Sequence, residues 1–287
     1  MALRAKKPQL VQKRLKTLFY GNAGVGKTTA AIQFPMPYLV DTERGSENDQ
    51  YVKHLDKVGG VVFHTSDFEE LVNEVKSLLT VKHEYRTLII DPLTILYNNL
   101  LDRAELKVGS DFGRHYAEAN KRIKHLLNLL LRLDMNVIIT SHAKPEYGQN
   151  MAVIGSTFDC YKKLDYLFDL VFEIQKRGKD RVALVKKTRI ETFGEGEVIP
   201  FSYNEIADRY GREILERDAM AQSLATVDQV AEYKRLVELL NVGPETQEKW
   251  FEKAKAETAE ELPQDVILKL TDAMKDRIEG KNNGTNK

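Results

Sequence analysis

GNAGVGKT, residues 21–28, decides how this sequence folds. The eight residues fit the pattern G-x-x-x-x-G-K-[ST], in which glycines let the backbone turn until its N–H groups point at phosphate oxygens. LKTLFYG (15–21), typical of a strand, precedes the motif, and TTAAIQF (28–34), which favours a helix, follows it. Because the motif requires this strand–loop–helix context, the sequence predicts a phosphate-binding loop.

Specific roles follow for the side chains of the loop. Lys27 is expected to reach the β- and γ-phosphates of a nucleotide, and Thr28 to offer its hydroxyl to Mg²⁺. ATP and Mg²⁺ are therefore the expected cofactors. The predicted nucleotide-binding residues are Gly21, Asn22, Ala23, Gly24, Val25, Gly26, Lys27, Thr28 and Thr29.

Outward from the loop, short β-branched runs alternate with helical patterns as far as about residue 200. Further strands are predicted at residues 37–43, 61–65, 87–91 and 136–141, a hairpin at residues 170–189 and a long amphipathic helix at residues 114–133. Ser66 and Glu69 are expected to form a capping box for a helix that runs to about Leu79. Strand–helix alternation with a late hairpin predicts an α/β fold with a mainly parallel central sheet.

The strand patterns stop after about residue 218, and three short helical patterns follow, separated by Gly243-Pro244 and Leu262-Pro263. The expected core of these helices is Leu236, Leu239, Leu240, Trp250, Phe251, Ile267 and Leu270. The predicted organisation is a basic N-terminal segment at residues 1–14, an α/β core at 15–218, a small helical domain at 219–280 and a disordered tail at 281–287.

Composition narrows the class of protein. Charged residues make up 30% and hydrophobic residues 42% of the chain, which fits a soluble globular protein, and no apolar run is long enough to span a membrane. Lys+Arg and Asp+Glu both number 43, which argues against nucleic-acid binding through bulk charge but allows a local basic groove. The single cysteine, Cys160, and the absence of a signal-peptide pattern predict a cytoplasmic location.

Positive charge gathers at the N-terminus, where residues 1–40 contain no acid. The basic residues before the first predicted strand are Arg4, Lys6, Lys7, Lys13, Arg14 and Lys16. They fit either a solvated tail or an arm that contacts phosphates.

Acidic residues complete the expected nucleotide site. Asp91 ends the apolar run TLIID (87–91), and an acid at the carboxyl end of such a strand lies beside the phosphate loop, where it can hold Mg²⁺ through its water shell. Hydrolysis also needs a group that orients or deprotonates water. Glu43 in YLVDTERG (38–45) is the candidate, and Asp41, on the same side of the strand, is the alternative.

Together these motifs resemble the RecA/RadA recombinase class of phosphate-loop ATPases, over about residues 15–200. In that class the second strand ends in a D-x-E pattern whose glutamate activates water, and DTE (41–43) matches it. A buried strand ends in the metal-linked aspartate, matched by Asp91. The resemblance implies a RecA-like core, ATP hydrolysis and head-to-tail homo-oligomers that form filaments or rings.

The resemblance also assigns roles to three further residues. The fifth strand of the class ends in a polar residue, commonly Gln, that senses the γ-phosphate, and IITSH (138–142) places His142 there. Histidine donates a similar hydrogen bond, with a charge that depends on pH. A late strand carries a K-x-[KR] pair that reaches the ATP of the neighbouring subunit, and Lys187 and Arg189 match it. The expected catalytic residues are Glu43, Lys27, His142, Lys187 and Arg189, and the expected metal-linked residues are Thr28 and Asp91.

Proteins of this class bind single-stranded DNA through two flexible loops. By position, the loops here are residues 106–114 and 143–157. Within them, Lys107, Arg114 and Lys144 are the candidates for phosphates, and Phe112 and Tyr147 are the candidates for stacking on bases.

The chain is most similar to the short single-domain RecA-like ATPases of bacteriophages, which serve as recombinases or single-strand-annealing proteins. The expected location is then the bacterial host cytoplasm. Small helical ends in such proteins dock partners, which makes a single-strand-binding protein or another recombination protein an expected partner of the C-terminal helices. Two other functions stay open: a DnaB-like helicase or loader motor, and a regulatory ATP switch that does not bind DNA.

Overall fold

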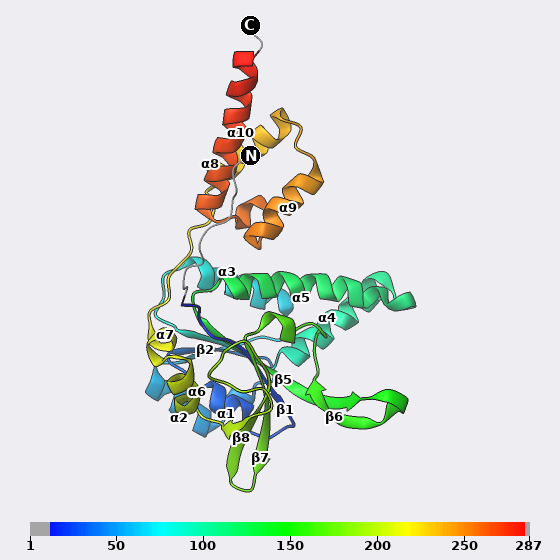
Figure 1. Ribbon diagram of the computed structural model, residues 1–287, viewed down its shortest axis with the longest axis vertical. Helices are drawn as coiled ribbons and strands as arrows, with labels where there is room; N and C mark the ends of the chain where they lie inside the picture. The colour runs from blue at the N-terminus through cyan, green and yellow to red at the C-terminus, as the bar shows by residue number, and fades with distance from the viewer. Residues whose placement is uncertain (1–11, 285–287) are drawn as a thin grey trace. The chain divides into compact units, whose positions relative to one another are not determined.

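The computed structural model of the chain describes residues 12–284. They form a mixed α/β fold around a mainly parallel sheet, which confirms the predicted fold class (Figure 1). The strands are β1 (Lys16–Gly21), β2 (Pro37–Asp41), β3 (Val61–His64), β4 (Thr87–Asp91), β5 (Asn136–Tyr147), β6 (Val153–Phe158), β7 (Leu170–Arg177), β8 (Asp180–Thr188) and β9 (Val198–Pro200).

The order of the strands brings the predicted motifs to one edge of the sheet. The row is β3-β2-β4-β5-β1-β7-β8-β9, parallel from β3 to β7 and antiparallel from β7 onward, and β6 pairs with β5 outside the row. The register sets Asp41 level with Asp91, and Gly21 level with His142. The carboxyl ends of β1, β2 and β4 therefore meet where ligands bind in sheets of this kind.

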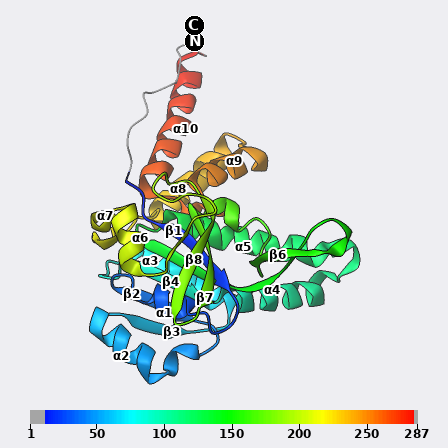
Figure 2. The ribbon, with the colours of Figure 1, turned by 60° about the horizontal axis from the view of Figure 1, so that its bottom comes forward.

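Helices connect the strands and complete the C-terminal part. The helices are α1 (Lys27–Ala31), α2 (Asp49–Val58), α3 (Phe68–Thr80), α4 (Leu93–Val108), α5 (Arg114–Arg132), α6 (Tyr203–Tyr210), α7 (Arg212–Glu216), α8 (Val227–Leu239), α9 (Pro244–Ala254) and α10 (Gln264–Gly284). Short 3₁₀ turns occur at η1 (Gly45–Glu47), η2 (Asp111–Gly113), η3 (Gln149–Met151), η4 (Asp165–Leu167) and η5 (Ala259–Glu261). Helix α1 contacts β1 and β5, and Figure 2 shows it against the sheet.

An aromatic cluster on β1 holds the sheet to the helix that follows the phosphate loop. The Phe19 ring centroid lies 4.9 Å from that of Phe201 and 5.9 Å from that of Phe172, and all three side chains are buried. Ala30 and Ala31 of α1 belong to the same apolar core. Because a buried aromatic side chain contributes about 2–3 kcal/mol, this packing fixes where the phosphate loop sits at the end of β1.

The chain divides into two compact units. The first runs through Ser66, resumes over Glu84–Leu96 and again over Met135–Ala219, and it contains the whole sheet. The second comprises Asp67–His83, Tyr97–Asp134 and the chain from Met220 onward. The second unit thus takes in α3, α5 and most of α4 as well as the predicted helical segment 219–280. The helices of this segment enclose a core that includes Leu236 and Ile267, whereas Leu239 is 57% exposed and lies outside it.

Two of the basic N-terminal residues have structural partners. Arg14 is 3% exposed, and its guanidinium donates hydrogen bonds to the carbonyls of Ile214, Arg217 and Asp218 at the end of α7. Lys16 is buried and donates to the carbonyl of Met135. Neither belongs to a solvated tail or a phosphate-contacting arm, because each satisfies backbone oxygens inside the first unit. Arg4, Lys6 and Lys7 lie outside the described residues.

Three local predictions differ from the structure. The N-cap of α3 is Asp67, which accepts hydrogen bonds from the backbone of Glu69 and Glu70, so the predicted capping role of Ser66 is wrong. Residues 143–157, predicted as a loop, lie mostly in the antiparallel pair β5–β6, because β5 continues to Tyr147. Helix α10 extends to Gly284, into the predicted disordered tail, and residues 285–287 lie outside the described residues.

None of the helices within residues 12–284 has the apolar length that a bilayer-spanning segment requires.

Candidate active site

One cavity collects most of the predicted site residues. Its volume is about 270 Å³, and it opens at the carboxyl edge of the sheet. The lining residues are Ala23, Gly24, Lys27, Thr28, Asp41, Glu43, Gly45, Asn48, Tyr51, Asp91, Pro92 and His142. Four segments that are distant in the sequence therefore converge here: the phosphate loop and the carboxyl ends of β2 and β4, together with β5 at His142.

The phosphate loop adopts the conformation that its glycines predict. Gly24 and Gly26 have φ angles of 75° and 96°, in the left-handed region that glycine adopts without strain. Lys27 is 9% exposed, and its ammonium donates to the carbonyls of Gly21 at 2.9 Å and Asn22 at 3.0 Å. Burial lowers the pKa of Lys27, although Asp91 and Glu43 oppose this effect.

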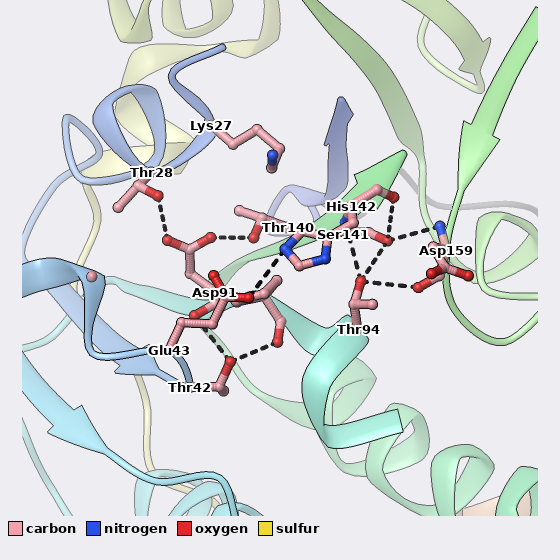
Figure 3. Close-up of polar contacts among 12 residues, drawn as sticks. Lys27, Thr28, Thr42, Glu43, Asp91, Thr94, Thr140, Ser141, His142 and Asp159 are labelled. Carbon is pink, nitrogen blue, oxygen red and sulfur yellow. Dashed lines mark hydrogen bonds and ion pairs between the residues drawn. The ribbon is translucent and has the colours of Figure 1, made fainter. Parts of the chain in front are cut away.

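Asp91 is the buried centre of the cavity floor (Figure 3). Its Oδ2 accepts a hydrogen bond from the Thr28 hydroxyl at 2.5 Å, and its Oδ1 accepts one from the Thr140 hydroxyl. Burial raises the pKa of Asp91, and the two hydroxyls and the charge of Lys27 oppose that rise. A hydroxyl and a carboxylate in contact at the end of a phosphate loop are the hard oxygen donors that Mg²⁺ prefers.

The donor set fits Mg²⁺ bound partly by a nucleotide. Within the part of the chain that the structure describes, no three His, Cys, Asp or Glu side chains converge to hold a metal. Mg²⁺ in nucleotide sites uses one or two protein oxygens and takes its other ligands from phosphates and water. Thr28 and Asp91 provide that small number.

Asp41 and Glu43 have different surroundings, although they lie two residues apart. Asp41 is 4% exposed, and its carboxylate accepts hydrogen bonds from the backbone of Glu43, Gly45 and Ser46 and from the Ser46 hydroxyl at 2.5 Å. Burial favours a higher pKa for Asp41, but these hydrogen bonds outweigh it and hold the pKa below its ordinary value. Asp41 therefore shapes the turn, whereas Glu43 extends into the cavity.

Glu43 meets His142 across the cavity (Figure 3). The distance from Glu43 Oε1 to His142 Nε2 is 3.2 Å, and both side chains are partly exposed. Glu43, two residues past the end of β2, and His142 of β5 are each predicted to act near the γ-phosphate, and they point toward one another.

Lys187 and Arg189 lie away from this cavity. Lys187 donates to the carbonyls of Asp165 and Phe168, and Arg189 donates to that of Tyr166 at 2.6 Å. Burial lowers the pKa of Lys187, and the charge of Arg189 adds to the effect. The strand register places this end of β8 level with the amino-terminal end of β1, opposite the phosphate loop. Their predicted action on a neighbour's ATP stays a prediction.

The sequence motifs did not identify several residues of this region. They are Thr140, which binds Asp91, Ser46, which binds Asp41, and the cavity residues Asn48 and Tyr51. Thr140 precedes His142 by two on an extended strand, and this spacing is a signal that both side chains share a face. No comparable signal marks the others.

A comparison of the sequence with models of protein families identifies the family of this chain. Residues 13–204 match the family described as AAA domain. The chain belongs to the AAA-domain family. The AAA domain contains the phosphate loop, Glu43, Asp91 and His142, and the protein is a P-loop ATPase of this family. No curated protein matches this AAA-domain chain.

Solved structures similar to this AAA-domain protein include a recombinase, a helicase and an ATPase. The RadB recombinase has a TM-score of 0.46 and 22% identity, over 64% of this chain and 84% of that one. A DnaB-like replicative helicase has a TM-score of 0.44 and 13% identity, over 65% of this chain and 55% of that one. The assembled ATPase EscN of the enteropathogenic E. coli type III secretion system has a TM-score of 0.40 and 14% identity, over 90% of this chain and 67% of that one.

Proposed function

We propose that this AAA-domain protein hydrolyses ATP and acts on single-stranded DNA, in homologous recombination or strand annealing of the bacteriophage type. The observation that supports the proposal most is the path of β5. The strand passes the cavity at His142 and continues without a break into the exposed β5–β6 hairpin. A displacement of His142 when a γ-phosphate binds could thus be transmitted along β5 to the exposed hairpin.

The hairpin has the character of a surface that contacts bases. Tyr147, Met151, Val153 and Ile154 are 55% to 76% exposed. Apolar side chains gathered on a protruding hairpin favour a partner that covers them. Unpaired bases offer apolar faces to aromatic and aliphatic side chains without regard to sequence. Lys144 at the root of the hairpin, which is ion-paired with Asp159, is the candidate for contact with a phosphate.

A hydrogen-bond network ties the root of the hairpin to the cavity wall (Figure 3). The Thr94 hydroxyl accepts from the backbone N–H of His142 at 3.1 Å and donates to the carbonyl of Asp159 at 2.9 Å. Lys144 donates to the Asp159 carboxylate at 3.0 Å. These bonds join the base of the β5–β6 hairpin to Thr94 in the first turn of α4, and on this proposal a movement at His142 is passed to the hairpin.

The chain's own residues suggest how hydrolysis proceeds. Lys27 leaves the loop carbonyls and binds the phosphate oxygens, while Thr28 and Asp91 would hold Mg²⁺, which neutralises charge on those oxygens. Glu43 orients water and accepts its proton. When His142 donates to the γ-phosphate, it leaves Glu43, so the base is released only where a triphosphate is present.

Lys187 and Arg189 fit an action between subunits. Both lie at the end of β8 that is remote from their own phosphate loop. A role in turnover therefore requires the loop of a second copy, which supports a head-to-tail homo-oligomer. Docking of a single-strand-binding protein on the C-terminal helices stays a prediction.

The test is ATP turnover with and without single-stranded DNA. We expect oligo(dT) to raise the turnover of the wild-type protein, and we expect the Tyr147→Ala/Ile154→Ser variant to lose this stimulation while its turnover without DNA is unchanged. Lys27→Ala is the control that removes turnover in both conditions. An ATP turnover rate that is the same with and without DNA would favour the regulatory switch. Directional unwinding of duplex DNA would favour the helicase. Either result contradicts the proposal.

A further inference from the structure

Arg181 lies on the phosphate loop of its own subunit. It belongs to β8 and pairs with Lys176 of β7. Residues opposite one another in an antiparallel pair share a face, and the next pair on this face, Ile174 and Ala183, belongs to the core that includes α1. Arg181 is therefore on the face that carries α1, where the β7–β8 hairpin extends past the end of β1 (Figure 1).

The approach of Arg181 to the loop is close. A Cβ atom added at Gly26 would lie 2.0 Å from Nε of Arg181 and 2.9 Å from its Cζ. The guanidinium thus covers the Gly26 Cα, directly before Lys27. Arg181 is exposed, and no residue among those described gives its side chain a hydrogen-bond or ion-pair partner. Its donors are free for a ligand at the loop.

The charges at the loop favour a polyanion. Lys27 and Arg181 are both cations, and no carboxylate pairs with Arg181 within residues 12–284 to reduce their repulsion. A chain of phosphates removes that repulsion, and a guanidinium binds phosphate through two parallel hydrogen bonds.

The order of the strands indicates which phosphate Arg181 meets. The strand of Asp91, β4, is two positions from β1 on one side, and β8 is two positions from β1 on the other. Arg181 therefore approaches the loop from the side opposite to Asp91. The metal-linked γ-phosphate belongs to the Asp91 side, so Arg181 faces the other end of the phosphate chain.

We propose that Arg181 binds the nucleotide in cis, at the α-phosphate side of the loop, and sets nucleotide affinity rather than the rate of hydrolysis. The proposal rests on the proposed nucleotide site. Arg189, at the far end of the same strand, is the candidate for action in trans, so one strand carries a binding arginine for its own loop and a finger for the next subunit.

The test measures affinity and turnover separately. In Arg181→Ala we expect the KM for ATP and the Kd for ADP to rise about tenfold, with kcat at saturating ATP within about twofold of the wild-type value. Arg181→Lys should recover part of the affinity, since it keeps the charge but loses the fork. Arg177→Ala is the matched control, because it removes the same charge from the opposite face of the same hairpin.

Two results would overturn the inference: the same Kd for ADP in Arg181→Ala and Arg177→Ala, or a lower kcat with an unchanged KM. Melting temperatures of the variants, compared with the wild type, exclude a folding defect. If the wild-type protein binds neither ATP nor ADP, the proposed nucleotide site itself fails. If the wild type binds and Lys27→Ala does not, but Arg181→Ala binds normally, the inference about Arg181 alone fails.

Discussion

Two carboxylates two residues apart illustrate how surroundings separate chemical roles. Asp41 is buried and accepts four hydrogen bonds from the turn that follows it, whereas Glu43 is partly exposed and points at His142. A carboxylate whose oxygens are already occupied is a poor acceptor for a proton from water. These surroundings support the proposal that Glu43 rather than Asp41 acts as the base, an alternative that the residues alone left open.

Glu43→Gln should keep nucleotide binding and lose hydrolysis by about 10²-fold or more, because a carboxamide accepts a hydrogen bond but does not take the proton. Asp41→Asn should instead lower the melting temperature, because an amide donates where Asp41 accepts from backbone N–H groups. ATP turnover and differential scanning fluorimetry on both variants separate the two roles. A larger loss of kcat in a stable Asp41→Asn protein would reverse the assignment.

The single thiol of the chain should be inert in the folded protein. Cys160 is 3% exposed, and burial raises the pKa of its thiol to about 12. At pH 8 we expect iodoacetamide to label it at least about a hundredfold more slowly than a free thiol, since only the thiolate reacts. Labelling in urea, followed by mass spectrometry, should give one adduct. Rapid native labelling would show that this region opens.

At the scale of elements, the sequence predicted those strands, turns and helices whose formation depends on neighbouring residues in the chain. The phosphate loop, the buried run of β4 and the β7–β8 hairpin are encoded by contiguous residues, and all form as expected. The partners in contacts between distant segments are harder to predict from sequence patterns. The bond of Thr140 to Asp91 and the bonds of Arg14 to α7 each depend on which strands and helices become neighbours, and the sequence alone does not specify that.

The length of β5 was underestimated for a related reason. Pro145 and Gly148 are typical of a loop, yet β5 continues past Pro145 because β6 pairs with it from the other side. Tertiary pairing overrides local propensity at such a position. The segment predicted as the second DNA-binding loop, residues 143–157, therefore lies mostly in the β5–β6 hairpin.

Glu261 holds η5 to α3 and α5 within the second unit. Its carboxylate is 2.7 Å from the Lys76 ammonium and 3.5 Å from Nε2 of His125, and it accepts from the backbone of Glu257. Burial favours a higher pKa for Glu261, but the hydrogen bonds to Lys76 and Glu257 and the charges of Lys76 and His125 outweigh it and lower the pKa. A carboxyl with a lowered folded pKa stabilises above its unfolded pKa, and this stability is lost as the pH falls through the folded pKa.

Glu261→Gln should therefore destabilise the unit by about 1–3 kcal/mol at pH 7, and the difference from wild type should shrink below about pH 4. The fluorescence of Trp250, the single tryptophan, during urea unfolding reports this directly, because Trp250 packs on the core of α8–α10. Glu260→Gln, on the exposed neighbour, should change the midpoint little. A pH-independent difference would contradict the charge argument.

At the scale of the whole molecule, two ends of one strand serve different partners in our scheme. The end of β8 beside the loop carries Arg181, and the other end carries Lys187 and Arg189. If the proposed finger acts in trans, each nucleotide site is complete only beside a second copy of the chain, and ATP hydrolysis requires an oligomer.

Arg189→Ala should bind ATP normally and lose turnover by up to about 10³-fold if the arginine acts in trans. Mixing Arg189→Ala with Glu43→Gln subunits should restore part of the activity, because some interfaces then pair an intact Glu43 with an intact Arg189. A residue that acts in cis gives no such rescue. Activity that stays absent at every mixing ratio, with mixed assembly confirmed by native mass spectrometry, would exclude the finger. Lys187→Ala should follow the same pattern more weakly, since lysine lacks the fork.

The continuity of β5 has a mechanical consequence. Its twelve residues span about 40 Å, and a strand is almost fully extended, so it transmits tension with little stretching. A load applied at the hairpin is borne in shear by the ladders to β1 and β4, and it reaches Thr140 as a displacement along the strand axis. Because Thr140 holds the carboxylate of Asp91, the proposed function implies that tension in a DNA strand bound at the hairpin pulls on a hydrogen bond of the cavity floor, and that the ATP cycle responds to force as well as to concentration.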